Sequence, residues 1–227
     1  MWVVILMGLV LGAKHATDAD HVVAVSTLVS RERSLRAAVP LGVFWGLGHT
    51  LTLLAFGGAI VLAGITISPR VGLSLELAVG VMLVALGVAA VVNWRRSSPP
   101  HEEHVEPRST EQNTSEPRMW LRLARSAFVG VVHGLAGSAA AALLVLGAIR
   151  DPRWAMVYLG VFGLGTIVGM AAVTIAMAVP LRFGLRRARF MNLSAALLSV
   201  GFGLFLIVDI GFVEGLFVSA SPTWTPE

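Results

Sequence analysis

The sequence predicts an all-α integral membrane protein with six transmembrane helices, arranged as two inverted three-helix repeats. Hydrophobic residues make up 56% of the 227 residues and charged residues 13%, and the mean hydropathy is +0.81. A charged share of about half the usual value leaves too few charged side chains to cover a soluble surface. The chain has no cysteine, which excludes disulfides, thiolate metal sites and iron–sulfur clusters.

Six apolar segments are long enough to cross a hydrocarbon core of about 30 Å, which takes about 20 helical residues. They are Trp2–Val29, Ala38–Ala63, Val71–Trp94, Ser126–Ile149, Trp154–Val179 and Phe190–Val213. Glycines recur inside these segments, as close helix packing in lipid favours.

Arginine placement predicts the orientation. The first, third and fifth connections and their borders hold Arg31, Arg33, Arg36, Arg95, Arg96, Arg108, Arg118, Arg122, Arg125, Arg182, Arg186, Arg187 and Arg189. The second and fourth hold only Arg70, Arg150 and Arg153. The positive-inside rule therefore places the odd connections in the cytoplasm and both termini outside, in a bacterial cytoplasmic membrane. The net charge of +4 then reflects membrane topology, and we expect no nucleic-acid partner.

The chain divides into two halves. We expect a first transmembrane repeat at residues 1–94, a cytoplasmic linker at 95–118, a second repeat at 119–217 and an extracytoplasmic tail at 218–227. The linker is rich in Ser, Pro and Glu, with Val105 as its one large apolar residue, which is typical of disorder. Its sequence His101-Glu102-Glu103-His104 is interpreted as a solvated polar run, with metal gathering as the alternative.

Short sequences recur between the halves. Gly-Val-Phe-Trp-Gly-Leu-Gly at 42–48 resembles Gly-Val-Phe-Gly-Leu-Gly at 160–165, and Gly-Ala-Lys-His at 12–15 resembles Gly-Val-Val-His at 130–133. Each half has three predicted crossings, an odd number, so the halves lie in opposite orientations. Inverted repeats with a binding site at the midplane are a transporter architecture.

Polar residues cluster near the middle of the first segment. His15, Asp18, Asp20 and His21 lie within seven residues, next to Lys14. A charged side chain at the centre of a membrane helix costs about 2.5–3.5 kcal/mol, so these groups must face protein, water or an ion. On an ideal helix, His15, Asp18 and His21 fall within an arc of about 120°.

Two imidazoles and a carboxylate on one face suit a divalent nickel, cobalt, zinc or copper ion. The alternative is a buried ion pair that locks helices together. Asp20 points away from the arc, so it orients a histidine or the helix unwinds there. We expect Lys14 to pair with Asp18 or Asp20.

Two further histidines are candidate ligands. His49 lies midway along the second segment and is interpreted as a third or fourth ligand, with plain packing as the alternative. His133 aligns with His15 in the repeat, and ligation and packing are equally compatible with its position.

The sequence Lys-His-Ala-Thr-Asp-Ala-Asp-His at 14–21 resembles a signature of the nickel/cobalt transporter family. Leu-Gly-His-Thr at 47–50 is similar to that family's next signature, Leu-Gly-His-Ser. The second half lacks the acidic residues of the later signatures. That difference and the six-helix length make the chain most similar to the shorter urease-accessory-type nickel permeases. The resemblance implies that His15, Asp18, Asp20, His21 and His49 bind metal, with His133 as a further ligand.

The resemblance implies a secondary transporter that takes up Ni²⁺, with Co²⁺ as a second candidate ion. Its partners are then the metal ion as substrate and the lipid bilayer, with nickel-enzyme maturation downstream, and it has no resident cofactor and no enzymatic activity. An exporter of the same ions, an intramembrane metal-dependent hydrolase and a helical scaffold are the alternatives. The sequence leaves open whether the chain forms a homo-oligomer.

Overall fold

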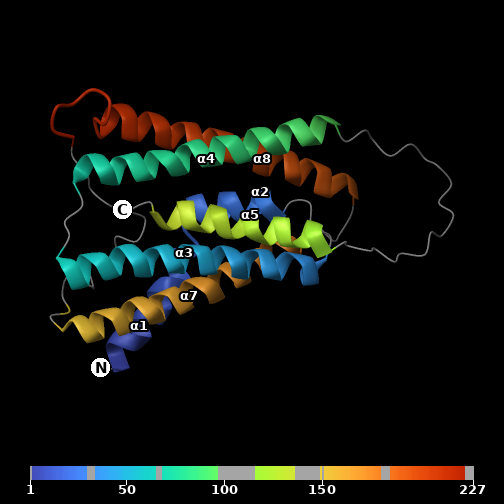
Figure 1. The fold of residues 1–227 in the computed structure, drawn as a ribbon. Helices are drawn as coiled ribbons and strands as arrows, with labels where there is room; N and C mark the ends of the chain where they lie inside the picture. Colours follow the sequence, from blue (N-terminus) through green and yellow to red (C-terminus); the bar gives the residue numbers. More distant parts are fainter. Residues whose placement is uncertain are drawn as a thin grey trace, which may run out of the picture.

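The computed structural model describes residues 2–29, 34–64, 68–96, 116–135, 149, 151–179 and 185–222, without the side chains of 116–118 and 185–189. Within these ranges all regular secondary structure is helical, which confirms the predicted all-α class (Figure 1). The helices are α1 (Trp2–His15), α2 (Ala19–Val29), α3 (Leu35–Ala63), α4 (Pro69–Arg96), α5 (Glu116–Leu135), α7 (Pro152–Ala178) and α8 (Leu185–Val208), which continues into a π-helical turn, η3 (Asp209–Val213).

Several helices are long and apolar enough to cross a membrane, as expected of a multi-pass membrane protein. Among the described residues, α3, α4, α7 and the segment Phe190–Val213 qualify singly, and α1 and α2 together qualify as one span bent by 57°. α5 begins at Glu116, ten residues before the predicted start of its span, and carries three arginines. The predicted continuation of that span, residues 136–148, lies outside the described residues, as do 97–115 of the linker with its His101–His104 motif.

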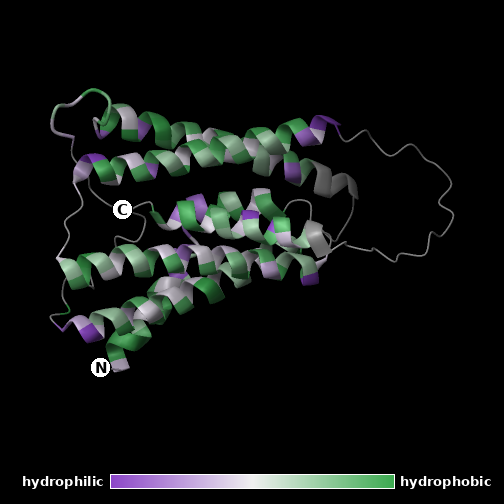
Figure 2. Cartoon of the chain, viewed as in Figure 1, coloured by the Kyte–Doolittle hydropathy of each residue, from purple (hydrophilic) through white to green (hydrophobic). Residues whose placement is uncertain are grey.

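The two ends of the bundle differ in charge. The start of α1 and the end of α8 lie at one end, and α3, α5 and α8 begin at the other, where α4 ends (Figure 1). This second end carries Arg36, Arg95, Arg96, Arg122 and Arg125. Apolar residues predominate along the helices, and hydrophilic residues gather mainly at helix ends (Figure 2).

The first predicted segment is a broken helix. α1 ends at His15 and α2 begins at Ala19, and a turn joins them. The Thr17 hydroxyl donates to the Lys14 carbonyl oxygen at 2.6 Å, and the Asp18 carbonyl oxygen accepts the Val22 N–H at 3.0 Å as the first bond of α2. Helix unwinding, one of the two alternatives for this segment, is therefore observed just before Asp20. The continuous helical arc is wrong because residues 16–18 leave the helix between the two histidines.

Glycines let the helices of the two halves touch. Gly12 of α1 lies so close to the Phe162 carbonyl oxygen of α7 that a Cβ would collide with it, and Gly130 of α5 lies likewise against the Trp45 carbonyl oxygen of α3. Gly12 and Gly130 are 118 residues apart, and Trp45 and Phe162 are 117 apart. The α1–α7 and α3–α5 contacts therefore use residues at equivalent positions of the sequence repeat.

A second reciprocal pair of contacts follows the same register. Gly165 of α7 lies against the Leu9 carbonyl oxygen of α1, and Gly48 of α3 lies against the Ala127 carbonyl oxygen of α5. In this pair too, the residues are 117 and 118 apart. The repeat seen in the sequence therefore appears as a repeated packing contact.

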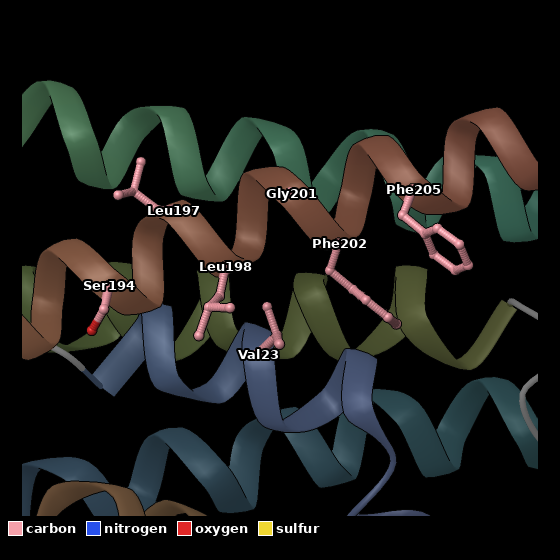
Figure 3. A pocket seen from close by; sticks show the side chains of 7 residues that line it. All are labelled: Val23, Ser194, Leu197, Leu198, Gly201, Phe202 and Phe205. Atoms are coloured by element: carbon pink, nitrogen blue, oxygen red, sulfur yellow. The ribbon is translucent and has the colours of Figure 1, made fainter.

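An apolar groove of about 610 Å³ lies between α2 and α8 (Figure 3). It is lined by Val23, Ser194, Leu197, Leu198, Gly201, Phe202 and Phe205. Ser194 is its one polar lining residue. α2 therefore meets α8 at this groove through Val23, while Asp20 and His21 of α2 contact residues of α5 and α3.

Candidate metal centre

Four histidines from four helices meet inside the bundle. His15 ends α1, His21 lies in the first turn of α2, His49 lies midway along α3, and His133 lies in the last turn of α5. The His15 side chain is 6% exposed and the other three are 0% exposed. The ring centroid of His21 lies 4.6 Å from those of His15 and His133 and 5.2 Å from that of His49. The sequence prediction that these residues share one site is consistent with this arrangement.

The imidazole rings of His15 and His49 face each other through their Nε2 atoms. Their Nε2 atoms are 3.1 Å apart, so in the neutral pair one nitrogen donates and the other accepts. Two imidazole nitrogens bound to one ion at about 2.1 Å lie about 3.0 Å apart at a right angle and about 3.4 Å apart at a tetrahedral angle. The observed separation therefore suits two ligands of a common ion.

His21 supplies a third nitrogen. Its Nδ1 atom lies 2.9 Å from Asp20 Oδ1, which leaves Nε2 as its available ligand atom. This Nε2 atom is buried and has no hydrogen-bond partner among the described residues. One ligand atom from each of His15, His21 and His49 can be chosen so that all three lie within 4.8 Å of one another. The three imidazoles therefore converge closely enough to hold one metal ion.

The two carboxylates lie behind the histidines. Asp18 Oδ2 is 2.7 Å from His15 Nδ1, and the Asp18 side chain is 42% exposed. Asp20 is 15% exposed and bridges two rings, with Oδ1 2.9 Å from His21 Nδ1 and Oδ2 3.0 Å from His133 Nε2. A carboxylate that accepts from Nδ1–H fixes the tautomer that leaves Nε2 free for a metal. This geometry favours an orienting role for both carboxylates.

A second set of candidate ligands adjoins the first. Asp20, His21 and His133 also offer ligand atoms within 4.8 Å of one another. His21 belongs to both sets, so the sets are neighbours that share one imidazole. Nδ1 of His133 is buried without a partner in the described part of the chain. His133 thus lies next to His21, and the Asp20 carboxylate bridges the two rings.

Lys14 and Thr50 lie next to the histidines in sequence, and neither contributes a charge or a free polar group to the cluster. The expectation that Lys14 pairs with an aspartate is wrong: its side chain is exposed, and no ion pair among the described residues joins it to Asp18 or Asp20. The hydroxyl of Thr50 donates to the Gly163 carbonyl oxygen at 3.1 Å, so this polar group is occupied by backbone. Lys14 therefore does not neutralise the two carboxylates of the site.

Sequence reasoning missed two aromatic side chains that contact the histidines. The Trp45 ring stacks on His21 at 6.0 Å with an interplanar angle of 14°, and it meets the His133 ring edge-on at 5.4 Å. The Phe162 ring lies 5.6 Å from that of His15. The available signal was their position in the repeat, because each residue directly precedes a Gly-Leu-Gly sequence, at 46–48 and at 163–165.

The fold and the site define a multi-pass helical membrane protein with a buried His/Asp cluster suited to a metal ion. No protein-family model and no solved structure matches the chain. The urease accessory protein UreH of Bacillus sp. (strain TB-90) is 36% identical over 220 residues, a match that covers 94% of this chain and 94% of that protein. The chain belongs to the family of this urease accessory protein.

Proposed function

We propose that the protein is a secondary transporter that carries Ni²⁺ into the cell across the bacterial cytoplasmic membrane, with Co²⁺ as a second candidate substrate. The observation that carries this proposal is the convergence of His15, His21 and His49 at the break of a membrane helix. Imidazole nitrogen suits nickel, and broken helices at the substrate site are typical of secondary transporters. The relative's name as a urease accessory protein agrees with a supplier of metal for nickel-enzyme maturation.

The proposed architecture has six crossings in two inverted repeats. In this arrangement α1 with α2, α3 and α4 form the first repeat, and α5 with the residues after it, α7 and α8 form the second. The reciprocal contacts of Gly12 with Phe162 and of Gly130 with Trp45 support the repeat. The arginines at the helix ends of one end of the bundle support a cytoplasmic location for that end, with both termini outside.

The two carboxylates, Asp18 and Asp20, offset the positive charge of a bound dication. A dication in a buried site needs nearby negative charge, since hydrocarbon and protein screen charges poorly. Asp18 and Asp20 carry two negative charges in contact with His15 and His21, which bind the ion through their other nitrogens. Since Lys14 pairs with neither carboxylate, both charges remain available to the ion.

Cells that express the protein should accumulate radioactive nickel, and His15→Ala should reduce this accumulation to background. His15 supplies the Nε2 atom that faces His49, so its loss leaves two imidazoles at the break. His101→Ala, a histidine of the predicted linker, is the matched control and should keep parental uptake. Uptake by His15→Ala at the parental rate would contradict the site. Lower cellular nickel on expression of the parent would instead assign export.

A further inference from the structure

We propose that Trp45 and Phe162 are the two gates of the metal site, with Trp45 closing it toward the arginine-rich end of the bundle and Phe162 closing it toward the opposite end. This inference rests on the proposed transport function and extends it, because a carrier must close its site on one side before it opens the other. The two residues belong to different halves and come from equivalent positions of the repeat.

Each ring covers a different part of the histidine cluster. Trp45 lies flat against His21 and edge-on to His133, and Phe162 lies against His15. Both aromatic side chains are 1% exposed. Because each ring is in contact with imidazoles and is itself shielded, an ion cannot reach the cluster past either ring without displacing it.

The helix directions place the rings on opposite sides of the site. α3 begins at the arginine-rich end, and Trp45 precedes His49 by one turn, so Trp45 lies on that side by about 6 Å. α7 begins at the other end, and Phe162 precedes Thr166, the counterpart of His49, by one turn. Gly163, which follows Phe162, packs on Thr50, which follows His49, so Phe162 lies beyond His49 toward that end of the bundle. The two rings therefore lie on opposite sides of His49.

The surroundings of the rings allow them to move. Trp45 Nε1 is buried without a hydrogen-bond partner in the described ranges, so displacement of the indole breaks no hydrogen bond of its own. An unpaired buried donor also makes the closed position less stable than a fully bonded one. Phe162 is held by ring contact with Tyr158 at 6.2 Å and with His15. Each gate side chain is therefore held by packing and not by a hydrogen bond of its own. A side chain held in this way can move aside repeatedly.

The absence of cysteine from the chain makes a direct test of sidedness feasible. Thr166→Cys introduces one thiol at a fully buried position of α7, one turn from Phe162, where the backbone of Thr166 packs on Gly12, three residues before His15. A membrane-impermeant maleimide is applied to intact cells, which reports the outer side, and to inside-out vesicles, which report the cytoplasmic side.

Each gate variant should expose the reporter from one side. If the open state of each gate is populated at or below about 10%, removal of the ring should raise the labelling rate from that side about tenfold. Phe162→Ala should do so in intact cells and Trp45→Ala in inside-out vesicles. Trp45→Phe keeps a ring at the gate and should label slowly, as the parent reporter does. Labelling that rises equally from both sides, from the wrong side or from neither would overturn the proposal.

A matched control separates gating from general loosening. Phe205→Ala removes an aromatic ring of α8 that is 59% exposed and touches none of the four histidines, so labelling from both sides should stay at the parental rate. Phe162→Leu serves as the milder outer variant if Phe162→Ala fails to fold by size-exclusion chromatography. It should raise labelling in intact cells only.

The readout does not depend on which ion is carried. One-sided labelling in a protein that binds no nickel would support the gates and reject the proposed substrate. Nickel uptake by the parent combined with slow labelling of every variant would keep the substrate and reject the gates.

Discussion

Replacing His49 with alanine should weaken nickel binding by more than about 100-fold. Loss of an outer-shell partner typically costs about 10–100-fold in metal affinity, and in the proposed site His49 supplies a ligand nitrogen itself. It is the one residue of the three-imidazole set that α3 supplies, and its Nε2 atom lies 3.1 Å from that of His15. Equilibrium dialysis of the purified protein against Ni²⁺ measures the effect.

Thr52→Val is the control for the His49 variant. Thr52 lies one turn further along α3, and its hydroxyl donates to the Gly48 carbonyl oxygen at 3.1 Å and lies 3.3 Å from the Val131 carbonyl oxygen of α5. Valine keeps the shape of the side chain and removes these hydroxyl contacts without touching a histidine. Its nickel affinity should equal that of the parent. Parental affinity in His49→Ala would show that the ion is held elsewhere.

Replacing Asp20 with asparagine should weaken nickel binding by about 10–100-fold, the usual effect of losing an outer-shell carboxylate. Asp20 accepts from His21 Nδ1–H with one oxygen and from His133 Nε2–H with the other. An asparagine side chain has one acceptor oxygen and no charge, so one of the two histidines loses its partner and the dication loses a negative neighbour. The same dialysis measurement reports the change.

Asp18→Asn is the matched comparison for Asp20→Asn. Asp18 contacts only His15 among the four histidines and its side chain is 42% exposed, so water can replace part of what it provides. Its loss should therefore weaken binding less than the loss of Asp20. An equal or larger effect of Asp18→Asn would reverse the assigned roles of the two carboxylates.

The helical membrane class was predictable because it depends on composition and segment length alone. α3, α4, α7 and the segment Phe190–Val213 are each at least 24 residues long and apolar enough to cross a membrane. The break between α1 and α2 was predictable only as an alternative. Sequence patterns locate polar residues in a span, but they do not decide whether the backbone stays helical around them, since neighbouring helices can satisfy the freed groups.

The members of the site were easier to predict than their roles. Buried charge is costly in a membrane, so His15, Asp18, Asp20 and His21 stood out at once. A helical wheel then grouped Asp18 with the two histidines and set Asp20 aside. The turn at residues 16–18 changes these directions, and it places Asp20 between His21 and His133.

The remaining features depend on tertiary contacts. Trp45 and Phe162 are apolar residues in apolar helices, so composition gives no reason to single them out. Their contacts with histidines arise only when α3 packs on α5 and α7 packs on α1. Lys14 was expected to pair with an aspartate because the three residues are close in sequence, but it follows α1 to an exposed position while the aspartates turn toward the histidines.

X-ray absorption spectroscopy of the purified, nickel-loaded protein tests the central claim most directly. We expect a nickel first shell that includes three imidazole nitrogens at about 2.1 Å, with the outer-ring scattering that identifies histidine. A shell made only of oxygen ligands, without imidazole scattering, would contradict the assignment of His15, His21 and His49 as the site that holds the ion.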